Sequence, residues 1–191
     1  MTLLSLCAML LVAEPEADVE DLQPDRGPKV WEVYAGVMGG MRMADPAGGG
    51  GFAVGLNRKF WFFRPEVMIG LGLYAQPVDM LTVIRIGTRV EWPWGEHAFR
   101  PYLWLAFAHN HESGIDNVIH DPFGQVFGLS EHGVHHRSGG EVGLGFDYEL
   151  PRILTDVIRG HVGARMTLTE FFGDDYPPRY LDLTAMVGIA F

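Results

Sequence analysis

The sequence predicts an all-β fold, an eight-stranded antiparallel up-and-down transmembrane β-barrel, on three observations. The chain has 191 residues, a length that suits one domain with a substantial interior. It is 48% hydrophobic, yet it contains no apolar run of 18 residues, so a membrane-spanning helix is excluded. From Lys29 onward apolar residues recur at every second position, as they do in strands, and the helical period of 3.6 residues does not persist.

Composition excludes several other classes of protein. Lys and Arg total 14 against 24 Asp and Glu, a net charge of −10, whereas nucleic-acid binding requires a basic surface. The single Cys excludes both a disulfide framework and a cysteine-based zinc site. The 25 glycines are roughly twice the usual share of about 7%, but they follow no collagen period.

The N-terminal segment is predicted to lie outside the barrel. Residues 3–13 form an apolar stretch of the length of a signal-peptide core, and we interpret residues 1–17 as a signal peptide. No Lys or Arg precedes this stretch, so a buried N-terminal helix is the alternative. Residues 18–28 form an acidic, proline-containing linker with too little apolar surface to fold. The barrel is then residues 29–191.

The first four strands are predicted within 31–42, 52–57, 66–74 and 81–92. In each, apolar side chains alternate with a second set of Gly, Ala, Asn, Tyr, Met or charged residues, which places the two sets on opposite faces of the strand. The apolar face comprises Trp31, Val33, Ala35, Val37, Met41, Phe52, Val54, Leu56, Val67, Ile69, Leu71, Leu73, Ile84, Ile86, Val90 and Trp92.

The last four strands are predicted within 102–108, 141–150, 161–169 and 180–191. The final one alternates most regularly, with apolar residues at every second position up to the C-terminal Phe191. The apolar face comprises Leu103, Leu105, Phe107, Val142, Leu144, Phe146, Tyr148, Leu150, Val162, Ala164, Met166, Leu168, Leu181, Leu183, Ala185, Val187, Ile189 and Phe191.

Two features favour a membrane barrel over a soluble one. Alternation alone also fits a lipocalin-type binder, but here the polar face carries glycines beside opposed charges, as suits a narrow lumen. The connections are also predicted to alternate in length. Those around 57–60, 92–99 and 151–156 are short to moderate, and those on the other side include about twenty residues near 111–133, the pattern of outer-membrane barrels.

With eight strands, a leader and a terminal aromatic residue, the chain resembles the small outer-membrane β-barrel proteins of Gram-negative bacteria, the group of the OmpA transmembrane domain, OmpX and OmpW. The resemblance covers roughly residues 29–191. It implies a location in the bacterial outer membrane with both termini in the periplasm, and contact with outer-membrane lipids and lipopolysaccharide. It also implies that the outer-membrane assembly machinery reads the last strand, with Phe191 as the assembly signal.

The inward face predicts a charge-paired lumen. An eight-stranded barrel encloses a space that side chains fill, and buried charges must be paired. Five Arg stand against six acids, and Arg suits this role because its planar guanidinium bonds carboxylates in bidentate fashion. The predicted lumen residues are Glu32, Arg42, Arg64, Glu66, Arg85, Arg89, Glu91, Glu141, Asp147, Arg165 and Asp182. A gated path for small solutes is the alternative to a plugged lumen.

Six of the eight histidines fall between residues 109 and 136. His109 and His111 share one strand face, whereas His135 and His136 point oppositely, so at most one of these two joins the pair. Imidazole with carboxylate suits Zn²⁺, Ni²⁺ or Cu²⁺, and a polar surface loop without metal is the alternative. The candidate metal ligands are His109, His111, His120, His132 and His135.

A hydrolase is the alternative to a non-enzymatic barrel. His136 and Ser138 form an H-x-S pair that resembles the lipid A 3-O-deacylase family, whose His and Ser act with a Glu. Gly139 stands where that family has Asn. Glu149 lies near the distance of the family's Glu but points inward by parity, and Glu141 is too close. We therefore expect an integral outer-membrane barrel with a structural or surface-binding role, and no catalytic residues.

Overall fold

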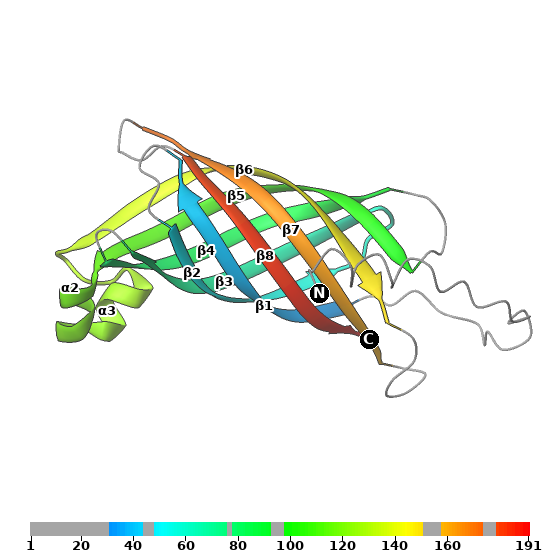
Figure 1. Ribbon diagram of the computed structural model, residues 1–191, viewed down its shortest axis with the longest axis horizontal. Coiled ribbons are helices and arrows are strands. Elements are labelled where there is room, and N and C mark those ends of the chain that lie inside the picture. The colour runs from blue at the N-terminus through cyan, green and yellow to red at the C-terminus, as the bar shows by residue number, and fades with distance from the viewer. Residues whose placement is uncertain (1–30, 44–47, 76–77, 93–97, 151–157, 174–178) are drawn as a thin grey trace, which may run out of the picture.

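The computed structural model is a closed barrel in which each strand pairs with its neighbours in sequence, antiparallel throughout, and β8 closes on β1 (Figure 1). It describes residues 31–43, 48–75, 78–92, 98–150, 158–173 and 179–191. The strands are β1 (Trp31–Arg42), β2 (Gly48–Arg58), β3 (Phe63–Ala75), β4 (Val78–Glu91), β5 (Phe99–Gly114), β6 (Val134–Glu149), β7 (Arg159–Phe171) and β8 (Arg179–Ala190). The predicted fold class is confirmed.

Two short helices lie at one end of the barrel, α2 (Ile115–His120) and α3 (Pro122–Phe127). They follow β5 at the end of the barrel opposite to the start of β1 and the close of β8 (Figure 1). At that other end Trp31 and Phe191 exchange backbone hydrogen bonds of 3.1 and 2.9 Å. No helix in the described ranges is long and apolar enough to cross a membrane.

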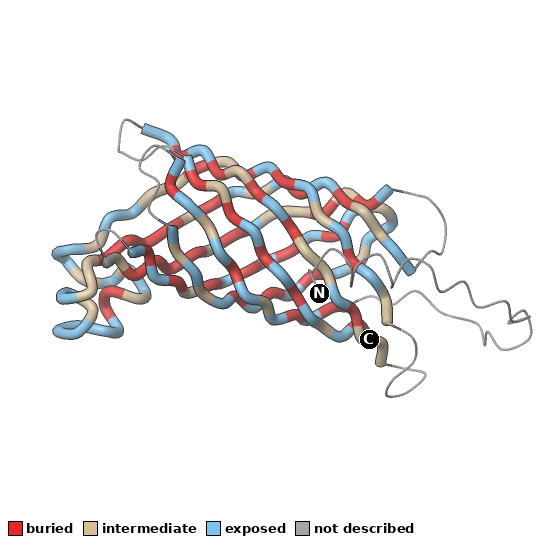
Figure 2. Tube along the Cα trace, viewed as in Figure 1, coloured by how far each residue is buried: buried red, intermediate tan, exposed pale blue. Residues whose placement is uncertain are grey.

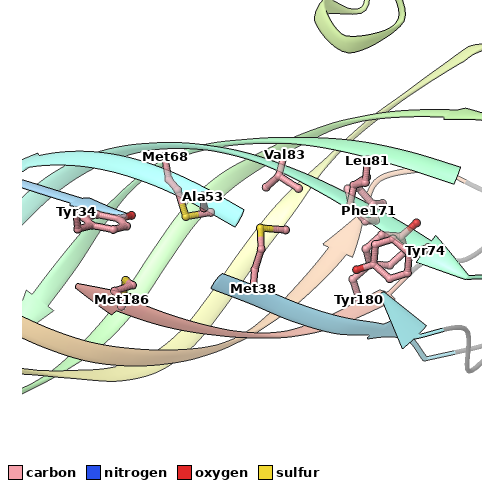
Figure 3. Close-up of a cluster of buried hydrophobic side chains, with 10 residues drawn as sticks. All are labelled: Tyr34, Met38, Ala53, Met68, Tyr74, Leu81, Val83, Phe171, Tyr180 and Met186. Atoms are coloured by element: carbon pink, nitrogen blue, oxygen red, sulfur yellow. The ribbon is translucent and has the colours of Figure 1, made fainter. Parts of the chain in front are cut away.

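Burial alternates along most of the barrel wall, which therefore has a filled inside and an apolar outside (Figure 2). At the helix end, residues 80–83 of β4 and 110–113 of β5 are buried on both faces. The outward face carries large exposed side chains, such as Val37, Phe52 and Leu144, at 59–67% exposure. The inward face carries all the predicted lumen charges together with an apolar cluster. Figure 3 shows Met38, Met68 and Val83 of this cluster in the barrel interior.

Glycines make room for aromatic rings inside the barrel. Tyr34 lies opposite Gly55 of β2, and Tyr102 opposite Gly145 of β6. A Cβ at either glycine would overlap the tyrosine ring, so each ring lies flat on the wall only because its cross-strand neighbour has no side chain. Tyr74 over Gly49 and His161 over Gly188 repeat the arrangement. The glycine excess thus serves lumen packing.

The structure corrects the predicted loop lengths. β3 ends at Ala75 and β4 begins at Val78, although a longer link was expected there. The predicted alternation of short and long links is therefore wrong, and only residues 115–133 stand out as long. The reason is that most strands run several residues beyond the clear alternation: β5, predicted over 102–108, extends from Phe99 to Gly114. The predicted signal peptide and linker lie outside the described residues.

Candidate functional site

The structure offers two candidate sites, the charged lumen and a histidine cluster on the outer wall. All eleven predicted lumen residues are buried, none more than 8% exposed: Glu32, Arg42, Arg64, Glu66, Arg85, Arg89, Glu91, Glu141, Asp147, Arg165 and Asp182. Two of their ion pairs join the neighbouring strands β3 and β4. The others join strands that are not neighbours and so cross the barrel interior, for example between Arg165 of β7 and Glu66 of β3.

Arg89 of β4 is the centre of the lumen network. Its guanidinium donates to Glu66, to Asp147 and, at 3.2 Å, to Glu32. It also lies over the rings of Tyr34 and Tyr102, at 5.1 and 4.9 Å from their centroids. A planar guanidinium suits this position because its five donors can reach several carboxylates at once while its face stacks on aromatic rings.

Further arginines extend this network. Arg165 donates to Glu66 at 2.7 Å and lies 4.1 Å from the ring centroid of Trp104. Arg64 donates at 2.8 Å both to Glu32 and to Glu91. Each of these carboxylates therefore has a cationic partner, as burial requires.

A second set of polar contacts lies nearer the helices. Glu141 accepts from Arg85 and from Trp104 Nε1, both at 2.6 Å, and from the Thr169 hydroxyl at 2.6 Å. Arg42 pairs with Asp79 at 3.1 Å. Asp182 accepts from the Tyr74 hydroxyl at 3.2 Å.

Several lumen residues were not singled out from the sequence. Five are aromatic and lie on the inward face, where all but Tyr102 donate to a carboxylate: Tyr34, Tyr74, Tyr102, Trp104 and Tyr180. Asn57, Asp79, Asn110, Glu112 and His161 are inward as well. Glu112 lies among the clustered histidines of the sequence, but β5 continues past it and its carboxylate accepts from the buried Tyr180 hydroxyl.

The histidine cluster consists of His109 and His111 of β5 and His136 of β6. Candidate ligand atoms of the three lie within 4.8 Å of one another. His109 Nε2 is 3.0 Å from His111 Nε2, and the His136 ring lies 4.7 Å from that of His111, centroid to centroid. The side chains leave the outer wall at the helix end, beyond the exposed apolar residues Leu105 and Phe107 of β5.

Neighbouring groups hold the two β5 histidines. His109 Nδ1 is 2.8 Å from the hydroxyl of Ser138, its cross-strand neighbour. His111 Nδ1 is 3.4 Å from the carbonyl oxygen of Val126 in α3. Thr82 of β4 also donates to this carbonyl, at 2.9 Å. α3 is thus fixed against the outer wall, where it covers His111.

Gly128 lets α3 approach the cluster this closely. It caps the helix in the left-handed conformation, with φ of 67°, which glycine adopts without strain. A Cβ here would also lie 2.6 Å from His111 Cε1 and 2.8 Å from His136 Cε1. Both backbone conformation and space therefore require glycine.

The structure separates the other predicted metal ligands from this cluster. His120 is exposed on α2, where its Nδ1 contacts the Asp116 carbonyl at 2.7 Å. His132 is exposed in the segment before β6, and His135 lies on the face of β6 opposite to His136. The register of β5 and β6, which pairs His111 with His136, selects His136.

The hydrolase-like pair of His136 and Ser138 lies beside the histidine cluster. Ser138 contacts His109 of the neighbouring strand. Glu141 points into the lumen towards Arg85, and Glu149 pairs with Arg159 at the far end of the strand, at 2.8 Å. In the described part of the chain no carboxylate belongs to the histidine cluster, so the Ser–His–Glu set of that hydrolase family is not assembled there.

Comparison with known proteins shows what this architecture resembles. No known protein family matches the sequence, and no curated protein matches it. Among solved structures, Neisserial surface protein A aligns with a TM-score of 0.56 at 15% identity, over 84% of this chain and 96% of that one.

Other solved structures are less similar. OprG from Pseudomonas aeruginosa aligns with a TM-score of 0.48 at 10% identity, over 87% of this chain and 98% of that one. Ail of Yersinia pestis aligns with a TM-score of 0.46 at 10% identity, over 85% and 98% of the two chains. The closed eight-stranded barrel and its alignment with Neisserial surface protein A show that the fold of this chain is that of the small eight-stranded outer-membrane β-barrels.

Proposed function

We propose that the chain is an integral outer-membrane β-barrel with a closed lumen, which acts as a structural or surface-binding protein through its helix end. One observation carries the proposal: large apolar side chains cover the outside of a closed barrel. Examples on four strands are Phe52, Ile86, Leu144 and Val187, each at least 58% exposed. Contiguous apolar surface of this extent is unfavourable in water and is stabilised by lipid.

Exposed aromatic residues support a defined position across the bilayer. A group of them gathers at the end that holds both ends of the barrel chain, where aromatic girdles mark the membrane interface. Its members are Trp31, Phe60, Trp61, Phe63, Trp92, Phe99, Tyr148 and Phe191. We assign this end to the periplasm. Phe191 then ends the strand that the assembly machinery is expected to read.

The opposite end presents apolar residues to the outer leaflet. Ile119 of α2 and Phe123 and Phe127 of α3 are 57–69% exposed, and Leu129 is equally so. Side chains of this kind insert at the boundary between headgroups and acyl chains. We infer that the helix pair rests on the outer-leaflet lipids, with lipopolysaccharide as its lipid partner.

The lumen contents support a plug. Arginine–carboxylate pairs connect opposite walls, and methionines fill the space between them. A cavity of about 10 Å³, lined by residues including Met38, Met68 and Arg165, has room for about one water molecule. A barrel filled in this way has a structural interior and meets its ligands at its surface.

Two measurements test the proposal. Detergent-extracted protein should migrate differently on gels before and after boiling, as membrane barrels do, and extraction should require detergent. In planar bilayers the wild-type chain should show no stable large openings, whereas the Glu66→Ala/Arg89→Ala/Arg165→Ala variant should conduct. Large stable openings of the wild type would overturn the plug, and solubility without detergent would overturn the membrane location.

A further inference from the structure

We propose that His109, His111 and His136 bind one divalent transition-metal ion of the zinc type on the outer wall of the barrel. The site lies outside the lumen and does not depend on the proposed closed lumen. The inference rests on the convergence of three imidazoles, on the groups that orient two of them, and on the chemistry of the ligand set.

The spacing of the ring nitrogens suits a metal. Two nitrogens bound to one tetrahedral Zn²⁺ at about 2.0–2.1 Å lie about 3.3 Å apart. His109 Nε2 and His111 Nε2 are 3.0 Å apart. All three histidines have candidate ligand atoms within 4.8 Å of one another, so His136 needs a movement of at most about 1.5 Å to reach this geometry. His136 is exposed, and rotation of its side chain supplies such a movement.

Protons on the Nδ1 atoms of His109 and His111 would leave both Nε2 atoms free to bind a metal. The Val126 carbonyl only accepts hydrogen bonds, so His111 Nδ1 carries the proton in their 3.4 Å contact and His111 Nε2 presents a lone pair. Ser138 can accept in the same way from His109 Nδ1, at 2.8 Å. Metal-binding histidines are usually held by such a contact on the other ring nitrogen. Two Nε2 lone pairs then lie 3.0 Å apart, and a cation bound to both relieves their repulsion.

A hydrogen-bonded relay is the competing arrangement. If the Ser138 hydroxyl donates to His109, then His109 Nε2 donates to His111 Nε2 and no metal is needed. That arrangement leaves His136 without a role, although its ring lies 4.7 and 5.7 Å from the other two, centroid to centroid. Convergence of the third imidazole favours the metal.

The ligand chemistry defines the class of ion. Three neutral imidazoles select Zn²⁺, Cu²⁺, Ni²⁺ or Co²⁺ over Ca²⁺ and Mg²⁺, which prefer oxygen. Three protein ligands leave one position of a tetrahedron for water or an exogenous ligand. The ion would join β5 to β6 and, through His111 and Val126, would hold α3 against the barrel.

Calorimetric titration of the full chain in detergent, without a polyhistidine tag, tests the site with Zn²⁺. We expect one ion per chain with micromolar or tighter affinity. His109→Ala and His136→Ala should each weaken binding at least tenfold, because each removes one of three ligands. All variants should keep the heat-modifiable gel shift, since these side chains lie outside the barrel.

Three controls separate this site from other histidines. His135→Ala changes the neighbouring residue on the opposite face of β6. His120→Ala/His132→Ala removes two exposed histidines, and His161→Gln removes the buried His of the Glu32, Asp147 and His161 group. Each control should bind Zn²⁺ like the wild type. Loss of binding in a control with retention in His136→Ala would overturn the proposal.

Two further measurements report the coordination geometry of the bound metal and its effect on α3. Co²⁺ in the wild type should give the intense visible absorption of four-coordinate cobalt, and His136→Ala should lose it. Zn²⁺ should slow amide hydrogen exchange in α3 of the wild type but not of His136→Ala. Millimolar Zn²⁺ binding that the His109 and His136 substitutions leave unchanged would overturn the site. If the chain binds no metal and a fluorophosphonate labels Ser138, the metal site is refuted and the hydrogen-bonded relay is the correct arrangement.

Discussion

Replacing Arg89 by methionine should strongly destabilise the barrel, because this guanidinium is the centre of the lumen network. Its side chain is fully buried, and it donates to Glu66, Glu32 and Asp147. Glu66 keeps Arg165 at 2.7 Å and Glu32 keeps Arg64 at 2.8 Å. Asp147 retains no other short ion pair among the described residues, so the variant leaves one buried carboxylate without its partner.

The magnitude follows from that orphaned charge. Removing one partner of a buried ion pair costs about 3–5 kcal/mol. With a urea dependence of about 2 kcal/mol/M, the unfolding midpoint in lipid vesicles should fall by about 1.5–2.5 M. Intrinsic tryptophan fluorescence measures this transition, since Trp104 is buried beside Arg165. Adding Asp147→Asn to Arg89→Met should restore part of the loss, because it removes the unpaired charge.

A matched exposed pair provides the control. Arg179 and Glu170 lie 3.1 Å apart, with side chains 53% and 60% exposed, and such pairs contribute about 0–1 kcal/mol. Arg179→Met should therefore change the midpoint little. If Arg89→Met loses no more stability than Arg179→Met, the charge network does not hold the lumen together and the reasoning is refuted.

Three other substitutions probe the outer wall, the glycine–ring contacts and the helix cap. Leu144→Arg, on the outward face, should lower the free energy of unfolding in vesicles by about 2–4 kcal/mol if the side chain faces the bilayer midplane. An unchanged urea midpoint would place this surface outside lipid. Gly145→Ala should lower the free energy of unfolding by about 1–3 kcal/mol because its Cβ overlaps the Tyr102 ring. Gly140→Ala, whose Cβ would have nothing within 4 Å, should have almost no effect, and equal urea midpoints of the two variants would argue against ring packing. Gly128→Ala should weaken Zn²⁺ binding at least tenfold in calorimetry, since its Cβ displaces α3 from His111; an unchanged affinity would show that α3 does not support the site.

Alternation was sufficient to predict the strands and the face on which each lumen charge lies. A one-residue shift would move every side chain to the other face, so the clear pattern around Glu66 or Asp147 left little freedom. Which arginine pairs with which acid depends on barrel closure, because Arg89 and Asp147 meet across the interior from strands β4 and β6.

The histidine cluster shows where sequence reasoning ends. Equal parity predicted the pair of His109 and His111, but the choice between His135 and His136 required the register of β5 against β6. The contact of Val126 with His111 depends on the path of residues 115–133. Two helices of six residues each are too short to leave a periodic apolar signal.

The rings that lie on glycines also constrain how such a barrel can evolve. Because Tyr34 fills the space that a side chain at Gly55 would need, and Tyr102 does the same at Gly145, neither partner can change size alone without loss of packing. Related sequences should therefore exchange each glycine and its ring together. A larger residue at position 55 should accompany a smaller one at position 34, and such paired exchange would reveal strand register in relatives whose sequences have otherwise diverged.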